Sequence, residues 1–459
     1  MSSLNILNID RKNFIINCLF SLLIFSFIAG NLVLNLNVLL IILISILFYG
    51  TKIINIRLIN IDKIIISFFL YVLVISTFNN IYDFFKDGRE DLTSLIKSIL
   101  FLRYLILYFI IRYFIKENII SLKIFFISAF CAVMFVCLDI FYQLIFGNDI
   151  FGFEAIERRL SGPFGDEIIA GSFIQRFSLF GLFLFPIFFK FKNKKVLYLI
   201  IFILISIFLS ALILAGNRIP LLFFILIMIA LIIFEQKLRR FFFPFIIIAS
   251  TIFTTAYISN TNINYHFHNF HKKIKQIFFI LSPENILSEE ELEIGFKEGD
   301  MKNNLFYTFE YKGNVYKITN SHLKEFKSGY LTWKINKYFG GGIKTFIKNC
   351  SKKYPNCGNH PHNYYLEILA ELGLLGFFII FYLFILVFLK KFVIKYFRDS
   401  EFKNYHLITP FIFLFFAEIF PIKSTGSFFT TGNATYIFLI LSMVVSLAER
   451  KNLIEDKIL

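Results

Sequence analysis

A polar and aromatic stretch directly before an apolar run carries the side chains best suited to chemistry. HPHNYYLEILAELGLLGFF begins at His360 and becomes apolar without a break. The ordinary pKa of an imidazole, about 6.5, suits proton abstraction at neutral pH, so His362 is the candidate general base. Its neighbours His360 and Asn363 are candidates for binding substrate. A lone histidine is more often a satisfied polar residue, but this one begins a predicted membrane helix.

Three charged residues elsewhere are placed where a bilayer would disfavour them. Arg218 lies between two apolar segments, in LAGNRIPLL. Burying an arginine at membrane depth costs free energy, so such a residue is usually functional. The alternative is an arginine at a helix end whose side chain snorkels to the membrane surface. Arg159 lies in RRLSGPFGDE, either a functional turn or a polar loop with an internal ion pair. Glu418 precedes PIKSTGSFFTTGN, which favours a lipid or sugar site or simply a turn between helices.

Histidines and cysteines also raise the possibility of a metal site. His266, His268 and His271 have no acidic or cysteine partner at ligand spacing, so we predict no metal site there. Cys350 and Cys357 alone do not complete four ligands. If their compartment is oxidising, we expect a disulfide that rigidifies the approach to His362.

The composition requires a membrane to position these residues. The chain has 459 residues, 57% of them hydrophobic, with a mean hydropathy of +0.71, whereas soluble domains are about 45–50% apolar. Apolar runs of about 20 residues predict about twelve transmembrane helices in an all-α polytopic membrane protein. These runs are 13–30, 32–50, 63–81, 97–115, 121–146, 170–190, 196–215, 218–235, 240–258, 364–389, 406–421 and 433–448.

Lysines and arginines cluster in alternate connections, which predicts that these connections and both termini are cytoplasmic. Much of the net charge of +16 is explained in this way, so it does not indicate a nucleic-acid partner. The clusters include Arg11, Lys52, Arg57, Arg112, Lys116, Lys190, Lys195, Lys237, Arg240, Lys390 and Arg398. We therefore predict nine membrane helices in 1–258, a large periplasmic loop domain in 259–363, and three membrane helices in 364–459.

The long loop shows patterns of its own. Residues 262–281 predict an interfacial helix on the membrane, with one apolar and one basic face. FYTFEYKGNVYKI predicts a small β-hairpin that turns at Lys312-Gly313-Asn314. Residues 322–348 look helical, interrupted by Gly340-Gly341-Gly342, a run that either lets the backbone approach something closely or ends a helix.

Several of these segments resemble the O-antigen ligase and O-antigen polymerase superfamily. The resemblance rests on His362, Asn363 and Gly373 in HNYYLEILAELGLLG, and on Arg218 and Leu222 in AGNRIPLL. It extends to Arg159, Gly162, Phe164 and Gly165 in RRLSGPFGDE, and to Gly340, Gly342 and Phe346 in GGGIKTF. One departure concerns a second arginine that the family commonly carries in the large loop. Here the equivalent place falls near His322, and that residue, Lys324 or Lys327 is the expected substitute.

The resemblance implies a GT-C-like membrane glycosyltransferase that needs no metal or other cofactor. It implies transfer of a glycan from undecaprenyl-pyrophosphate to a lipid A–core sugar on the periplasmic face of the bacterial inner membrane. Arg218 and a loop cation would neutralise the pyrophosphate, and His362 would deprotonate the acceptor hydroxyl, inverting the anomeric centre.

Three other functions stay open. An O-antigen polymerase would join two lipid-linked repeat units, and an oligosaccharyltransferase would glycosylate protein. A transporter or flippase would need two related halves and polar residues near the midplane; we see no such symmetry, and the polar candidates gather at one face.

Overall fold

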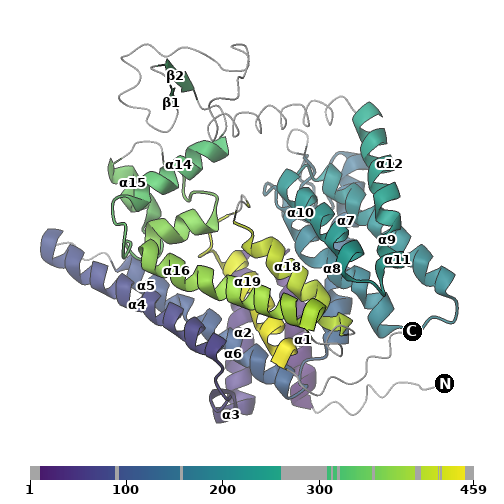
Figure 1. The fold of residues 1–459 in the computed structure, drawn as a ribbon, viewed down its shortest axis with the longest axis horizontal. Coiled ribbons are helices and arrows are strands. Elements are labelled where there is room, and N and C mark those ends of the chain that lie inside the picture. The colour runs from purple at the N-terminus through teal and green to yellow at the C-terminus, as the bar shows by residue number, and fades with distance from the viewer. Residues whose placement is uncertain are drawn as a thin grey trace.

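The computed structural model is built almost entirely of helices (Figure 1). It describes residues 11–87, 92–155, 159–259, 308–311, 314–317, 321–353, 357–398, 405–421, 423 and 426–449. The predicted interfacial helix at 262–281, with its three histidines, lies outside these residues, and so does Arg158.

The first part of the chain, up to residue 259, forms helices α1 to α12. Their bounds are α1 (Arg11–Ser26), α2 (Asn31–Tyr49), α3 (Thr51–Ile54), α4 (Asn60–Asp87), α5 (Thr93–Phe101), α6 (Arg103–Lys116), α7 (Leu122–Phe146), the 3-10 turn η1 (Gly162–Phe164), α8 (Ala170–Phe188), α9 (Lys194–Leu214), α10 (Arg218–Phe234), α11 (Arg239–Phe242) and α12 (Pro244–Ser259).

The remaining elements follow from residue 308. They are strands β1 (Thr308–Tyr311) and β2 (Asn314–Lys317), α14 (Ser321–Trp333), α15 (Phe346–Lys353), α16 (Tyr364–Val393), the π-helix η3 (Ile394–Arg398), the 3-10 turn η4 (His406–Ile408), α18 (Thr409–Ile419) and α19 (Thr431–Glu449). The two strands pair antiparallel, with Phe309 opposite Tyr316. The tip of the turn between them lies outside the described residues, so the predicted hairpin as a whole stays a prediction.

A helix lies over each of the twelve predicted spans, but length and composition support fewer crossings. In the described part of the chain, eight helical segments are long and apolar enough to cross a membrane. Two shorter apolar helices, Arg218–Phe234 and His406–Ile419, accompany them. The multi-pass helical architecture is thus established, whereas the count of twelve stays a prediction.

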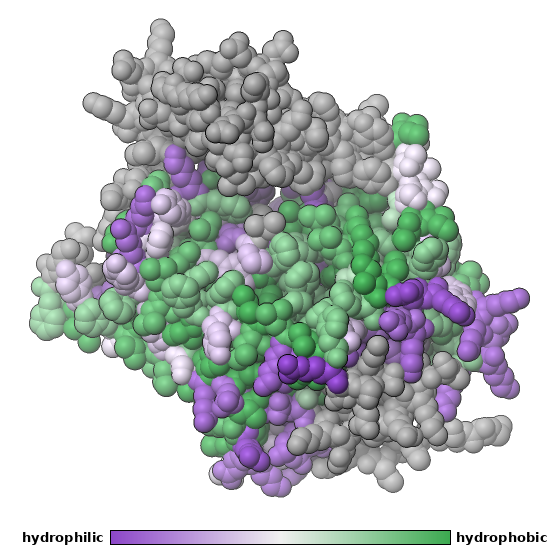
Figure 2. All heavy atoms as spheres, viewed as in Figure 1, coloured by the Kyte–Doolittle hydropathy of each residue, from purple (hydrophilic) through white to green (hydrophobic). Residues whose placement is uncertain are grey.

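Apolar side chains cover the middle of the molecule (Figure 2). Hydrophilic residues gather over α3 and α11 on one side of this band and over α14 and α15 on the other (Figures 1 and 2). Within the bundle, α8 and α19 are the most enclosed spans, with 78% of each apolar window buried, compared with 33% for α2 and α4. The centre of the bundle therefore lies around α8 and α19, and α18 packs against both.

The loop before α16 is helical with an interruption, as predicted. Two helices, α14 and α15, are separated by turns around the glycine run. Gly340 and Gly342 have positive φ values of 75° and 92°, a region that side chains with a Cβ rarely adopt. The interruption also begins earlier than predicted, because α14 ends at Trp333, ahead of the glycines.

A candidate active site at one end of the bundle

Asn363 fixes the start of α16 and the position of the histidines before it. Its Oδ1 accepts hydrogen bonds from the backbone N–H groups of Tyr365 (3.0 Å) and Leu366 (3.1 Å), the N-cap arrangement. Its Nδ2 donates to the carbonyl oxygens of Pro421 (2.7 Å) and Lys423 (3.3 Å). The Asn363 side chain is buried, with 5% of the residue exposed. Through these hydrogen bonds it joins the start of α16 to the segment after α18.

Three histidines meet at this helix start. The ring centroids of His360 and His362 are 4.3 Å apart, and those of His322 and His362 are 5.8 Å apart. His362 has a φ of 51°, an uncommon conformation for a residue with a Cβ. His322 comes from α14, so the structure places the expected substitute for the loop arginine beside the candidate base. Lys324, on the same helix, is half-buried.

Glu325 is a carboxylate near His362 that the sequence did not single out. Burial raises its pKa, and the charges of His362 and Lys324 oppose that rise. A Cβ at Gly358 would lie 2.6 Å from its Oε2, so Glu325 packs against the segment that leads to the histidines. A carboxylate in this place suits the predicted role of His362 as general base, because an anion stabilises a protonated imidazole.

His360 gives the site a testable response to pH. Burial, with the charges of His362 and Lys344, lowers the pKa of His360 to about 4. The unfolded chain, with an ordinary histidine pKa near 6.5, then binds the proton first. This contribution to stability is complete above about pH 6.5 and is lost as the pH falls to about 4. We expect the melting temperature of the purified protein to fall across this window, and less so in His360→Asn; equal slopes would contradict the assignment.

Arg159 and Arg218 also lie together. Arg218 begins α10, and the preceding turn contains Gly216, where a Cβ would lie 2.9 Å from Cγ of Arg159. The charge of Arg159 acts on Arg218. Asn217 holds this turn against α8, since its Oδ1 accepts from the N–H of Gly171 (3.1 Å). Two neighbouring guanidinium groups are suited to bind the oxygens of a phosphate.

Glu418 is the hub of a buried cluster. It is 1% exposed, and its carboxylate accepts hydrogen bonds from Arg176 (2.6 and 3.1 Å), Lys423 (2.7 Å) and Tyr364 (2.7 Å). Arg176, on α8, also lies 4.7 Å from the ring centroid of Tyr436. Burial lowers the pKa of Lys423, and Glu418 opposes that shift. The predicted contact of Glu418 with substrate stays a prediction; in the structure its carboxylate is bound by Arg176, Lys423 and Tyr364.

A cavity of about 730 Å³ opens beside this cluster. Arg176 and Lys423 line it, together with Asn433 and an aromatic wall that includes Phe164 and Phe173. The Arg159 loop contributes Pro163 to Glu167, and the first turn of α10 contributes Ile219 and Pro220. The cavity therefore borders three of the segments that the sequence singled out. Among the described residues, no three His, Cys, Asp or Glu side chains are arranged to hold a metal ion.

The segment around the glycine run is joined to α16 by backbone hydrogen bonds. The N–H of Gly342 donates to the carbonyl of Glu371 (2.8 Å), and that of Leu374 donates to the carbonyl of Lys337 (2.9 Å). Gly373 breaks the helical geometry of α16 at this contact, with a φ of 66°. The Gly340–Gly342 motif and Gly373, separate in the sequence, thus form one backbone junction.

Lys344 follows this junction and is a second cation near the histidines. Its N–H donates to Oε2 of Glu371 (2.7 Å), and its Nζ donates to Oγ of Ser427 (2.9 Å). Ser427 in turn donates to Glu367 of α16. Because the charge of Lys344 acts on His360, it is a further candidate for the role of the loop arginine.

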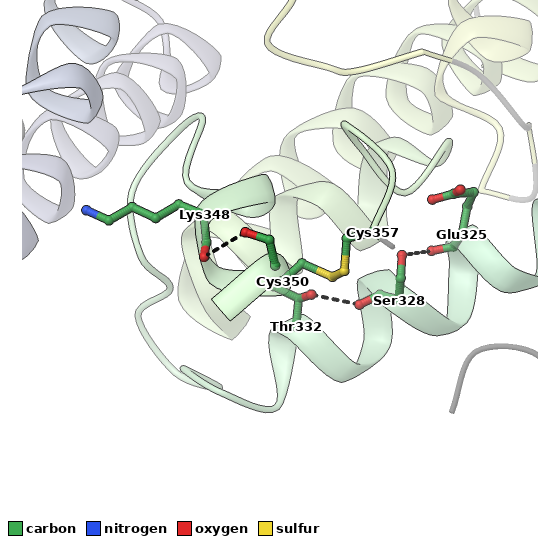
Figure 3. Close-up of a disulfide and its surroundings, with 7 residues drawn as sticks. Glu325, Ser328, Thr332, Lys348, Cys350 and Cys357 are labelled. Atoms are coloured by element: carbon green, nitrogen blue, oxygen red, sulfur yellow. Dashed lines mark hydrogen bonds between the residues drawn. A yellow bond between two sulfur atoms is a disulfide. The ribbon is translucent and has the colours of Figure 1, made fainter. Parts of the chain in front are cut away.

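A disulfide joins Cys350, within α15, to Cys357 (Figure 3). It lies beside α14, near Ser328 and Thr332, and Cys350 is fully buried with Phe346 and Ala370. The bridge therefore ties the segment before His360 to α15, which packs against α14 and α16.

Sequence reasoning missed Arg176, Glu325, Lys344 and Lys423. Of these, Arg176 had a usable signal, because it is an arginine inside a predicted span, in SFIQRFSLF. The others lie in polar segments, where a charged residue is unremarkable from the sequence alone.

Comparison with known families agrees with the motifs. No protein with a curated description matches the chain. A family model described as O-antigen ligase matches residues 200–381. That range contains Arg218, the glycine run, His362 and Gly373. Over these residues, less than half of the chain, the protein is therefore similar to the O-antigen ligase family, which agrees with the resemblance of its motifs.

Proposed function

We propose that this protein transfers an O-antigen glycan from undecaprenyl-pyrophosphate to an acceptor sugar on lipid A–core. The family match supports a glycosyltransferase-like membrane enzyme that uses lipid-linked glycans. One observation carries the proposal: His322, His360 and His362 converge at the start of α16. The N-cap of this helix, Asn363, also binds the backbone carbonyl of Lys423.

In the proposed reaction, the oxygen of the acceptor hydroxyl attacks C1 of the donor sugar. His362 takes the proton of that hydroxyl as the attack proceeds. The bond between C1 and the pyrophosphate oxygen breaks, and undecaprenyl-pyrophosphate leaves with the bonding electrons. Arg218 and Arg159 neutralise the charge that develops on the leaving group. Glu325 stabilises the protonated His362. Attack from the opposite face without a covalent intermediate inverts the anomeric centre, and no step uses a metal.

We further propose that the site faces the periplasm, with both termini in the cytoplasm of a bacterium and the protein in its inner membrane. The disulfide between Cys350 and Cys357 supports an oxidising compartment for the loop domain, 259–363. The regular alternation of basic connections supports the same orientation. The membrane parts, 1–258 and 364–459, would hold the lipid portion of the donor.

The test is a gene deletion followed by gel analysis of lipopolysaccharide. We expect long-chain lipopolysaccharide to vanish and polymerised lipid-linked glycan to accumulate. Wild type should restore the ladder, and Arg218→Ala should not, because the leaving pyrophosphate loses its cation. A core carrying a single repeat would instead indicate the polymerase, which joins lipid-linked repeat units. An unchanged ladder would contradict both assignments and favour other glycans or transport.

A further inference from the structure

Two carboxylates are buried on one face of α16. Glu367 and Glu371 lie four residues apart on this helix, and they are 2% and 1% exposed. Burying a charge costs free energy unless hydrogen bonds and opposite charges compensate it, and apolar side chains of similar size would pack there at less cost. Two such groups side by side therefore indicate a specific task beyond stability.

Glu371 holds the loop segment that begins α15. Its Oε2 accepts a hydrogen bond from the N–H of Lys344 (2.7 Å), and its Oε1 accepts from the N–H of Phe346 (3.2 Å), the first residue of α15. A carboxylate at a helix N-terminus also interacts favourably with the helix dipole. Because α15 carries one half of the disulfide whose other half leads to the histidines, Glu371 acts on the segment that contains them.

Glu367 holds a different segment, the one that borders the cavity. Its Oε1 accepts from the hydroxyl of Ser427 (2.5 Å), and its Oε2 accepts from the N–H of Phe428 (2.5 Å). The carbonyl oxygen of Ser427 accepts from Oγ1 of Thr430 (2.8 Å) and Nδ2 of Asn433 (2.8 Å). These last two residues line the cavity, so Glu367 is linked to the cavity wall.

Lys344 joins the two carboxylates. Its Nζ donates to Oγ of Ser427 (2.9 Å), and the same hydroxyl donates to Glu367, so lysine, serine and glutamate form one charge-assisted chain. All four oxygens of Glu367 and Glu371 accept a hydrogen bond from one of the two segments. One network therefore holds the loop and the cavity wall to α16 and to each other.

We propose that Glu367 and Glu371 are positioning residues for transfer: acting through Lys344 and Ser427, they fix the loop that carries the histidines relative to the cavity. That the groups positioned here are those of glycan transfer rests on the proposed function. In this role neither glutamate touches the reacting atoms. Small displacements matter in such a site, because about 1 Å can cost on the order of 100-fold in rate.

The first experiment measures how firmly the loop is held and does not depend on activity. After the free thiols are alkylated, the full chain in nanodiscs is treated with dithiothreitol, and reduction of the disulfide is followed by mass. Glu371→Gln keeps the side-chain size but places an N–H₂ donor where one of the two backbone N–H groups needs an acceptor. Cys350 is fully buried, and reduction depends on access to the sulfur atoms. We expect reduction to be about tenfold faster than in wild type. Reduction at the wild-type rate would overturn the proposal.

The matched control is Glu235→Gln. Glu235 is also buried, at 2% exposed, and accepts hydrogen bonds from Tyr396 and Thr409 (both 2.7 Å). It follows the far end of α10, about 25 Å along the helix from Arg218. We expect this variant to be reduced at the wild-type rate. Equal acceleration in both variants would mean general loosening of the fold, which contradicts the proposal.

Transfer kinetics in proteoliposomes then test what the pair does for the reaction. We expect Glu367→Gln and Glu371→Gln to lower kcat about 10- to 100-fold and to leave the KM for the donor within about threefold, because alignment is lost while the donor site is kept. Glu235→Gln should keep the wild-type kcat. A raised KM with an unchanged kcat would overturn the proposal.

A double-mutant cycle tests whether the glutamate acts through the lysine. Lys344→Met removes the charge from a half-buried side chain, so it also serves if a buried glutamine prevents folding. We expect Lys344→Met to lower kcat about tenfold, and Glu367→Gln combined with it to be no slower than the slower single variant. A wild-type kcat in Lys344→Met, or losses that multiply, would overturn the proposal. If wild type transfers no glycan to lipid A–core, the proposed function is rejected, and faster reduction in Glu371→Gln still supports the positioning of the loop.

Discussion

His362→Ala will reduce glycan transfer about 100-fold or more while the protein still folds and binds the lipid-linked donor. Removal of a general base typically costs 10²–10⁴ in rate. His362 lies before the Asn363 cap and is half-buried, so the truncation leaves the cap bonds of α16 in place. The measurement is transfer by purified enzyme in proteoliposomes, with donor binding determined on the same preparation.

The neighbouring histidine provides the control for this prediction. The pKa of His360 is lowered to about 4, which makes its imidazole a weaker base than an ordinary histidine. We expect His360→Gln to retain transfer within about tenfold of wild type. If the effects were reversed, His360 would be the base, and the role given to His362 would be wrong.

The two adjacent rings have different charged neighbours. The carboxylate of Glu325 acts on His362, whereas the positive charge of Lys344 acts on His360. An anion stabilises a protonated ring and a cation destabilises it. The arrangement therefore disfavours proton uptake at His360, whose pKa is lowered.

The helical layout could be predicted from the sequence because apolar runs report burial in lipid directly. The break at Gly30-Asn31, weak as a pattern, is where α2 begins, at Asn31. The extent of the helix before the glycine run was predicted less well. Residues 334–345 have no strong breaker before Gly340, and their turns follow from contacts with α16 that only the folded chain makes.

Only the part of the candidate site that depends on local sequence could be predicted. His362, Arg218 and Arg159 carry motifs that are local in sequence. The cluster of Arg176 and Glu418 joins residues 242 positions apart, and the bond between Lys344 and Ser427 spans 83 positions. Such pairs depend on how helices pack, and no spacing rule reports them.

Gly340→Ala will prevent stable folding, and this prediction separates a structural role of the glycine run from a ligand-binding one. A Cβ at Gly340 would lie 2.2 Å from the carbonyl oxygen of Glu371, and the residue has a φ of 75°. The contact is with backbone, which cannot rotate away. Strain and overpacking together cost roughly 3 kcal/mol or more. We expect loss of the folded protein, seen as a strongly lowered melting temperature or absence of a monodisperse peak in detergent.

Gly341→Ala is the matched control, one residue along the same run. A Cβ there would meet the ends of two side chains, Nδ2 of Asn349 at 2.5 Å and Oγ1 of Thr345 at 2.9 Å, which can move. We expect this variant to fold, with a melting temperature close to wild type. If Gly340→Ala instead folded normally and lost only transfer, the run would serve the substrate, and the junction with Gly373 would not be its purpose.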